Sequence, residues 1–347
     1  MLRGEKAMTT YKERLFNAID GKELDRVPCI CPGGMMNMII RDIMILTNSF
    51  WPMAHTDSNV MATLSEGLYK NGAFENIGVP FCMTVEAEAM GAKVYMGTDI
   101  TEPRVTEYPI NTVDDFKNLH NINVSEGRCK VVLDAIKILK DRNKDVPVIG
   151  NLTGPVSVAS SLLDASEFYK DLRRKPDMMR NFMDFVTDNL IEFGKAQINA
   201  GADIITISDP SGTGEILGPK LFKEFALPYI NKLVNALSPL VNGRVIVHIC
   251  GRLKSIFKEL NDLNVKVLSF DSITSIKDVK ENVNNKRLMG NVSTLALETA
   301  TPVEIRKLSS YCIKSGVSIL SPACGIGVRT SLDNIKAMVD ASKENML

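Results

Sequence analysis

The segment Arg244-Val-Ile-Val-His-Ile-Cys-Gly251 joins a short apolar run to two potential metal ligands. Its near-continuous apolarity and its valine and isoleucine content are typical of a strand buried on both faces of a parallel sheet. A glycine follows, and it lets the backbone turn away from the strand. The segment therefore predicts a buried strand whose carboxyl end presents His248 and Cys250.

Similar apolar runs recur along the chain, separated by segments with helical spacing. They are Val27–Cys31, Val148–Leu152, Asp203–Ser208, Val265–Phe270, Arg287–Met289 and Val317–Leu320, with a weaker candidate at Ile77–Met83 or Val94–Met96. About eight strand–helix units in a chain of 347 residues favour an α/β fold of the (β/α)8 TIM barrel type. The competing architecture is a doubly wound open sheet, which usually carries a glycine-rich phosphate loop. The sequence contains no G-x-G-x-x-G or Walker A pattern, which favours the barrel.

Charge and composition restrict the class of protein. The 41 basic and 41 acidic residues balance, so nothing in the charge favours nucleic acid or an anionic membrane as a partner. No apolar run approaches the length of a membrane span, and Met1–Glu13 carries charges where a secretory signal would be apolar. Without a linker or a repeat, residues 1–347 are expected to form a single barrel domain in the cytoplasm, with no nucleic acid and no membrane as partner.

A methionine-rich stretch, Gly33–Pro80, separates the first two expected strands. If it leaves the carboxyl end of the first strand, it forms an N-terminal helical addition over the barrel mouth, as a lid or a docking surface. The alternative is an irregular helical layer in which methionine fills gaps.

A second cysteine segment is expected to meet the first. Cys324 lies in Leu320-Ser-Pro-Ala-Cys-Gly-Ile-Gly327, just after the last apolar run. Alternate residues of a strand point to the same side, and all strand carboxyl ends of a barrel gather at one mouth. His248, Cys250 and Cys324 then form a Zn²⁺ ligand set with a fourth position open to substrate. The alternative is that these residues serve only packing.

Two carboxylates near strand ends are candidate catalytic groups. Glu86 follows a weak strand, and Asp209 follows Asp203–Ser208. Either can position a substrate, although an aspartate at this place also suits the N-cap of a helix. The remaining histidines, His55 and His120, are expected at the solvated surface.

The order of several motifs resembles the uroporphyrinogen decarboxylase superfamily over nearly the whole chain. The motifs are Leu24-Asp-Arg-Val-Pro28, Ile149-Gly-Asn-Leu-Thr-Gly-Pro155, Val247-His-Ile-Cys-Gly251, Met289-Gly-Asn-Val292 and Ile319-Leu-Ser-Pro-Ala-Cys-Gly-Ile326. The resemblance implies a (β/α)8 barrel.

The superfamily that this chain resembles has two branches. The decarboxylase branch has an arginine motif after the first strand and an aspartate after the second. Cys31–Met38 contains no arginine and Phe81–Gly91 contains no aspartate, which counts against a cofactor-free decarboxylase. In the corrinoid-dependent methyltransferase branch, similar to the methylcobamide:coenzyme M enzymes, zinc is bound by His-x-Cys and a distant Cys. His248, Cys250 and Cys324 match that pattern.

In that branch, the zinc-bound thiol of coenzyme M takes the methyl group from the cobalt of a partner corrinoid protein. This chain has no D-x-H-x-x-G signature, so methylcobalamin is expected on a separate corrinoid protein. The direction of transfer stays open. The acceptor is a thiol such as coenzyme M, or a folate, or else a methoxylated or methylated small molecule donates its methyl group to a Co(I) corrinoid protein.

Overall fold

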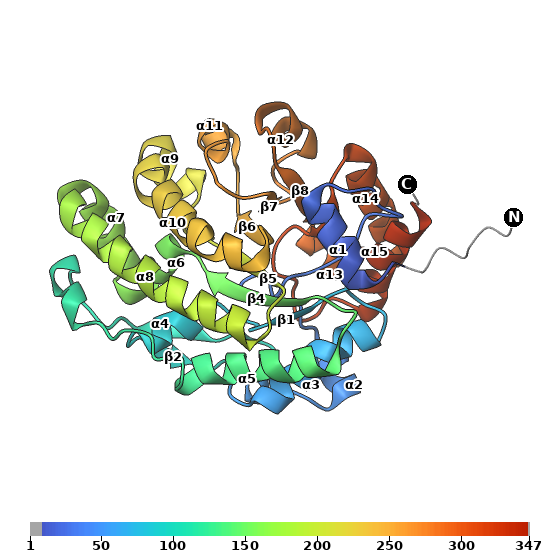
Figure 1. Ribbon diagram of the computed structural model, residues 1–347, viewed down its shortest axis with the longest axis horizontal. Helices are drawn as coiled ribbons and strands as arrows, with labels where there is room; N and C mark the ends of the chain where they lie inside the picture. The colour runs from blue at the N-terminus through green and yellow to red at the C-terminus, as the bar shows by residue number, and fades with distance from the viewer. Residues whose placement is uncertain (1–8, 346–347) are drawn as a thin grey trace, which may run out of the picture.

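A computed structural model describes residues 9–345 and shows a curled parallel sheet surrounded by helices (Figure 1). The seven strands lie in the order β1-β4-β5-β6-β7-β8-β9. Their bounds are β1 (Ile77–Val79), β4 (Val148–Thr153), β5 (Ile204–Ser208), β6 (Val245–Ile249), β7 (Val267–Phe270), β8 (Arg287–Val292) and β9 (Ile319–Pro322). Six of the predicted runs are therefore strands β4 to β9, and the weaker candidate Ile77–Met83 contains β1.

The helices follow the strands in the alternation that the sequence predicts. They are α1 (Tyr11–Asp20), α2 (Arg41–Thr47), α3 (Ser58–Lys70), α4 (Val85–Ala89), α5 (Gly127–Arg142), α6 (Pro155–Leu162), α7 (Ala165–Arg174), α8 (Pro176–Ala200), α9 (Gly214–Leu221), α10 (Leu227–Leu237), α11 (Phe257–Leu260), α12 (Ile276–Asn282), α13 (Thr294–Thr299), α14 (Pro302–Ser315) and α15 (Leu332–Glu344). Short helical turns cover 53–55, 113–118, 222–226, 238–241 and 254–256. A separate antiparallel hairpin joins β2 (Lys93–Tyr95) to β3 (Arg104–Glu107). No helix among residues 9–345 has the length and apolarity that crossing a membrane requires.

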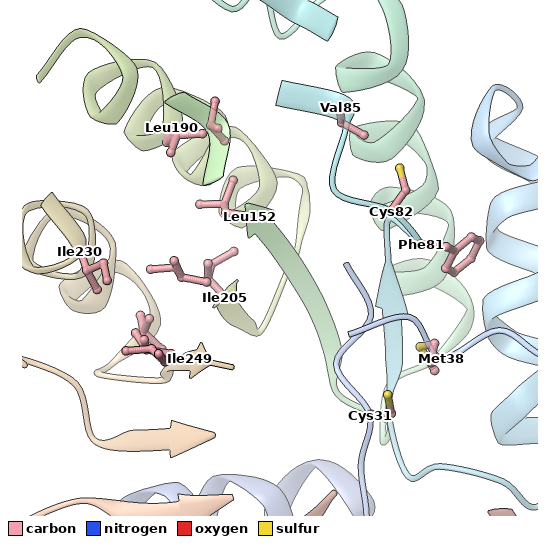
Figure 2. Close-up of a cluster of buried hydrophobic side chains, with 14 of the residues drawn as sticks. Cys31, Met38, Phe81, Cys82, Val85, Leu152, Leu190, Ile205, Ile230 and Ile249 are labelled. Atoms are coloured by element: carbon pink, nitrogen blue, oxygen red, sulfur yellow. The ribbon is translucent and has the colours of Figure 1, made fainter. Parts of the chain in front are cut away.

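The outer face of the sheet packs against the helices. Figure 2 shows Leu152, Ile205 and Ile249, from β4, β5 and β6, beside Leu190 of α8 and Ile230 of α10. All five side chains are buried, with at most 2% exposed. Because successive residues of a strand point to opposite faces, the residues adjacent in sequence to Leu152, Ile205 and Ile249 face inward.

Helix α1 lies across one end of the sheet (Figure 1). Leu15 and Ile19 pack in the same cluster as inward-facing residues near the starts of the strands. Asp20 forms ion pairs with Arg244 and Lys266, at 3.2 and 3.0 Å, and these two residues directly precede β6 and β7. Helix α1 therefore lies at the amino end of the strands, and the addition expected over the mouth concerns the later stretch 33–80.

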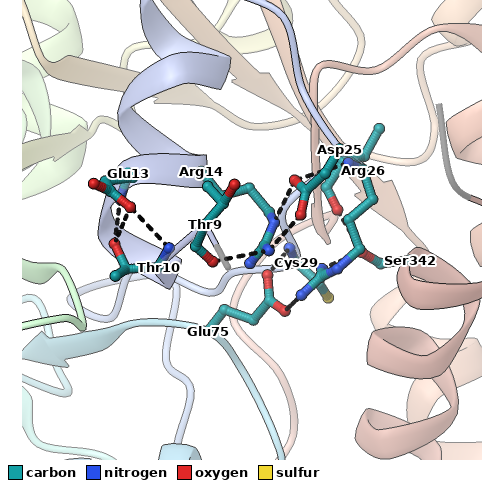
Figure 3. A network of polar contacts seen from close by, with 10 residues as sticks. Thr9, Thr10, Glu13, Arg14, Asp25, Arg26, Cys29, Glu75 and Ser342 are labelled. Atoms are coloured by element: carbon teal, nitrogen blue, oxygen red, sulfur yellow. Dashed lines mark hydrogen bonds and ion pairs between the residues drawn. The ribbon is translucent and has the colours of Figure 1, made fainter. Parts of the chain in front are cut away.

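The first predicted run, Val27–Cys31, lies between β9 and β1 but is not a full strand. Cys29 forms one parallel bridge with Leu320, and Glu75 N donates to Cys29 O at 2.9 Å. Side chains supply further bonds (Figure 3): Arg26 pairs with Glu75 and donates to Ser342 Oγ of α15 at 2.9 Å. This buried network fixes a segment that has few ladder hydrogen bonds.

Part of the stretch 33–80 does lie at the carboxyl end of the strands. Arg41 N, at the start of α2, donates to Val328 O at 2.8 Å, and Asn37 O accepts from Ile326 N at 2.8 Å. Both partners belong to the loop after β9, which carries Cys324. Helix α2 therefore begins beside the loop that carries Cys324, at the carboxyl end of the strands.

Candidate metal centre

Strand β6 and the loop after β9 bring three ligand atoms together. His248 is buried within β6, while Cys250 directly follows that strand and Cys324 follows β9. One ligand atom of each residue lies within 4.8 Å of the other two. His248 Nε2 is 3.0 Å from Cys250 Sγ, which is 3.6 Å from Cys324 Sγ. The convergence expected from strand-end placement is thus present in the geometry.

This donor set fits a tetrahedral zinc ion. With Zn–N near 2.0 Å and Zn–S near 2.3 Å, two donors on one ion are separated by about 3.5 to 3.8 Å. The sulfur–sulfur distance of 3.6 Å already falls in that range, and the nitrogen–sulfur distance of 3.0 Å is shorter than it by about half an ångström. Among the described residues, this is the one group of three or more His, Cys, Asp or Glu side chains close enough to hold a metal.

The two thiols influence each other's protonation. A hydrogen bond from Cys250 lowers the pKa of Cys324, and His248 lowers it further. The same hydrogen bond between the two sulfurs, together with burial, raises the pKa of Cys250. A cation bound between the two sulfurs would favour loss of both thiol protons.

Ser269 of β7 orients the imidazole, a role that sequence reasoning missed. Its Oγ lies 2.9 Å from His248 Nδ1 and 3.8 Å from the Sδ atom of Met36. In the parallel ladder His248 is paired with Ser269, so both side chains point inward. With Nδ1–H donated to Ser269, the imidazole directs Nε2 at the metal centre, as ligand histidines generally require. Pairing the predicted strands in register would have identified this serine.

The methionine-rich stretch contacts the other side of the centre. Met35 Sδ lies 3.7 Å from Cys324 Sγ. A β-carbon at Gly325 would be 2.7 Å from Met35 O, so glycine permits this close approach of the two backbones. Residues 35 and 36 therefore form part of the wall of the metal centre.

Asp209 lies next to the centre, but its carboxylate serves the start of helix α6. Its oxygens accept hydrogen bonds from Val156 N at 3.1 Å, and from Ser157 N and Oγ at 2.9 and 2.6 Å. The side chain is fully buried, and burial raises the pKa of the carboxyl group. These contacts resemble the helix-capping alternative, although Asp209 caps α6, the helix that follows the neighbouring strand β4, and not the helix that follows β5.

Glu86 is similarly engaged away from the three ligands. It belongs to α4 and accepts from Thr153 N at 2.8 Å and Thr153 Oγ1 at 3.1 Å. Only 1% of the residue is exposed, and burial raises the pKa of its carboxyl group. Glu86 thus ties α4 to the end of β4.

His55 is buried, so the prediction of a surface position was wrong. Its ring lies between Trp51 and Phe81, with centroid distances of 5.1 and 6.3 Å. Burial lowers the pKa of the imidazole to about 3, which keeps the ring neutral. Trp51 is close to His55 in the sequence, and Phe81 follows β1. Packing against these two rings holds the imidazole inside the protein.

Comparison with known proteins places these features in a family. The family model for uroporphyrinogen decarboxylase (URO-D) matches residues 10–345. The methylcobamide:CoM methyltransferase MtbA of Methanosarcina acetivorans is 33% identical over 97% of this chain and 99% of its own. The methylcobamide:CoM methyltransferase MtaA of Methanosarcina barkeri is 33% identical over 96% of this chain and 98% of its own.

A solved structure agrees with these relatives. The structure of a methyltransferase from Methanosarcina mazei has a TM-score of 0.91 at 33% identity, covering 97% of this chain and 99% of that one. A uroporphyrinogen decarboxylase of Thermodesulfovibrio yellowstonii is 27% identical over 74% of this chain and 75% of its own. The chain therefore belongs to the uroporphyrinogen decarboxylase family, in the part of it that includes the methylcobamide:CoM methyltransferases.

Proposed function

We propose that this protein is a zinc-dependent methyltransferase that moves a methyl group from a corrinoid protein to a small thiol such as coenzyme M. The observation that carries the proposal is the convergence of His248 Nε2 with the two sulfurs of Cys250 and Cys324. One imidazole and two thiolates suit zinc, and three protein ligands leave a fourth position for a substrate. The names of the 33%-identical relatives support the choice of methylcobamide and coenzyme M.

The chemistry follows from the donor set. When bound, zinc would hold the substrate sulfur as a thiolate near neutral pH. Transfer forms a sulfur–carbon bond and breaks the cobalt–carbon bond, and the electron pair of the broken bond stays on cobalt. The products are a methyl thioether and a Co(I) corrinoid, and the thiol proton has been released to solvent. A folate is the other acceptor that the proposal allows.

The chain's own residues bind and orient. His248, Cys250 and Cys324 would hold the metal, and Ser269 would fix the imidazole through its 2.9 Å contact with Nδ1. For Asp209 and Glu86 we propose a positioning role, because their carboxylates hold the start of α6 and the end of β4. We also propose that residues 27–31 take the place of the eighth strand of a (β/α)8 barrel. The parallel bridge between Cys29 and Leu320 supports this proposal.

A second candidate is transfer in the opposite direction, from a methylated substrate to a Co(I) corrinoid. The methylated-thiol–coenzyme M methyltransferase of Methanosarcina mazei favours it, at 28% identity over 96% of this chain and 89% of its own. The same three ligands would then bind the sulfur of a methylated thiol. Direction is therefore a question for kinetics.

The test uses zinc-loaded protein, free methylcobalamin and a panel of thiols that includes coenzyme M. We expect thiol-dependent demethylation of the cobalamin, followed by its absorbance, and a methyl thioether identified by mass spectrometry. Absence of demethylation with every thiol, while methylated thiols methylate Co(I) cobalamin, would support the second candidate. Absence of both reactions would contradict the proposal.

A further inference from the structure

The sulfur of Cys324 has two sulfur neighbours. Cys250 Sγ lies 3.6 Å from it, and Met35 Sδ lies 3.7 Å from it. Two donors on one zinc ion are separated by about 3.5 to 3.8 Å. The thioether of Met35 therefore lies at the distance from Cys324 that a further ligand of the same ion would have.

Hydrogen bonds fix the segment of Met35 to the loop that carries Cys324. Asn37 O accepts from Ile326 N at 2.8 Å, and the Asn37 side-chain amide donates to Ile326 O at 3.1 Å. A β-carbon at Gly325 would be 2.9 Å from Asn37 N, so the two backbones are in direct contact. The backbone that carries Met35 is thus held beside a metal ligand, and the side-chain torsions decide where its sulfur lies.

The side chains of Met35 and Met36 differ in their freedom to move. Met36 is fully buried, and its Sδ lies 3.8 Å from Ser269 Oγ. Met35 is only partly buried and packs against the cluster of inward-facing strand residues. Methionine is unbranched and has three rotatable bonds, so a partly exposed methionine adapts its conformation readily. Met35 therefore combines a place beside Cys324 with the freedom to bind an ion and to release it.

No carboxylate among residues 9–345 competes for this place, since no Asp or Glu oxygen joins the three ligand atoms within 4.8 Å. Asp209 is engaged by α6, and Asp271 Oδ1 accepts from Ile273 N at 2.9 Å. Two thiolates already balance the charge of Zn²⁺. A carboxylate would leave a net negative charge in a largely buried site, whereas a thioether adds no charge. Thioethers also belong to the soft ligands that suit zinc.

We infer that Met35 Sδ is the fourth ligand of the metal centre in the resting protein, and that the sulfur of the substrate displaces it. In the displacement, the thiol releases its proton to solvent, a bond from the metal to the thiolate forms, and the bond to the thioether breaks. A cation attracts a thiolate more strongly than a neutral thioether, which favours the exchange. This inference rests on the proposed function and names what holds the substrate position before the substrate arrives.

The test counts the sulfur neighbours of zinc by X-ray absorption at the zinc K-edge, in zinc-loaded protein without thiol. We expect about three sulfurs and one nitrogen in the wild type. In Met35→Leu we expect about two sulfurs, one nitrogen and one lighter atom, because water takes the place of the thioether. A wild-type centre with only two sulfurs would overturn the inference.

Met36→Leu provides the matched control. It removes the neighbouring thioether, whose sulfur contacts Ser269 and not a metal ligand. Leucine has nearly the volume of methionine, so both variants should keep the fold. Met36→Leu should retain about three sulfurs on zinc. Loss of the same sulfur in both variants would indicate a general disturbance of the centre and would overturn the assignment to Met35.

Addition of coenzyme M tests the displacement. The sulfur number should stay at about three in the wild type, where thiolate replaces thioether, and should rise from about two to three in Met35→Leu. The Kd for coenzyme M, measured by calorimetry, should fall about fivefold or more in Met35→Leu, because no internal ligand has to leave first. An unchanged or higher Kd would contradict the displacement.

Three outcomes separate this inference from its premise. Wild-type protein that binds no zinc would refute the metal centre, and the ligand Met35 with it. A wild-type centre with three sulfurs, together with a Met35→Leu centre that does not change when thiol is added, would refute the thiol acceptor and leave Met35 as a ligand. A wild-type centre whose two sulfurs rise to three with thiol would support the proposed function and overturn only the role of Met35.

Discussion

Two neighbouring layers on the inner face of the sheet differ completely in character. The lower layer is aliphatic and buried: Ile149, Ile204, Ile246, Val267 and Ile319. Two residues further along the same strands, the upper layer is polar and equally buried: Asn151, Thr206, His248, Ser269 and Ser321. Since residues two apart face the same side of a strand, one such step along the strands changes an apolar layer into a polar layer that includes the ligand His248.

The difference shows where the fold gains its stability and where it gives some up. The lower layer packs with Leu15 and Ile19 of α1. In the upper layer, Asn151 Oδ1, Thr206 Oγ1 and Ser321 Oγ are buried without a hydrogen-bond partner among the described residues. An unpartnered buried polar group costs about 1 to 3 kcal/mol, so this layer is expected to serve function.

The largest expected effect comes from making the lower layer polar. Ile246→Asn removes a fully buried side chain and buries an amide among aliphatic residues. We expect the free energy of unfolding to fall by about 4 kcal/mol or more, measured by urea denaturation. Leu240→Asn, at a 52% exposed position, should change it by less than about 0.5 kcal/mol. If Ile246→Asn lowered the free energy of unfolding by less than about 1 kcal/mol, the lower layer would not be a main source of stability.

A smaller effect is expected where the upper layer supports the metal centre. Ser269→Ala removes the partner of His248 Nδ1 and should weaken zinc binding about 10- to 100-fold, measured by competition with a chromogenic chelator. Ser269→Thr, which keeps the hydroxyl, should restore most of the affinity.

Ser309→Ala is the control for that variant. Ser309 is fully buried on α14, and its Oγ has no hydrogen-bond partner among the described residues. Its replacement should leave zinc affinity unchanged. Equal affinities for Ser269→Ala and the wild type would show that the serine does not orient the ligand.

The smallest effect is expected for Thr206→Val in the upper layer. The Oγ1 atom has no partner among the described residues, and valine has nearly the same shape. Thermal unfolding should show stability that is unchanged or higher by up to about 1 kcal/mol, with normal zinc content. A clear loss of stability would indicate that the hydroxyl group is hydrogen-bonded in solution, and the contrast between the layers would be weaker.

Much of this arrangement could be predicted from the sequence because its signals are local. The apolar runs identify β4 to β9, and the strand-end positions of His248, Cys250 and Cys324 predict their convergence. The placement of α1 could not be predicted in this way, since its contacts with Arg244 and Lys266 join distant parts of the chain.

The environment of the candidate carboxylates could not be predicted from the sequence either. Nothing near Asp209 in the sequence reveals that its partners are Val156 and Ser157, because that contact depends on the neighbouring strand β4 and the helix after it. The role of Ser269 can be recognised only once the strand register is known. The burial of His55 can be recognised only once its aromatic neighbours are placed in three dimensions.

The most direct test of the central claim is metal analysis of the purified protein. We predict about one zinc per chain in the wild type. Cys324→Ser should lose the metal or bind it about a thousandfold more weakly, since one of three protein ligands is removed. Cys312→Ser, at a buried cysteine of α14, should keep its zinc. Equal zinc in wild type and Cys324→Ser, or no zinc in either after supplementation, would contradict the account.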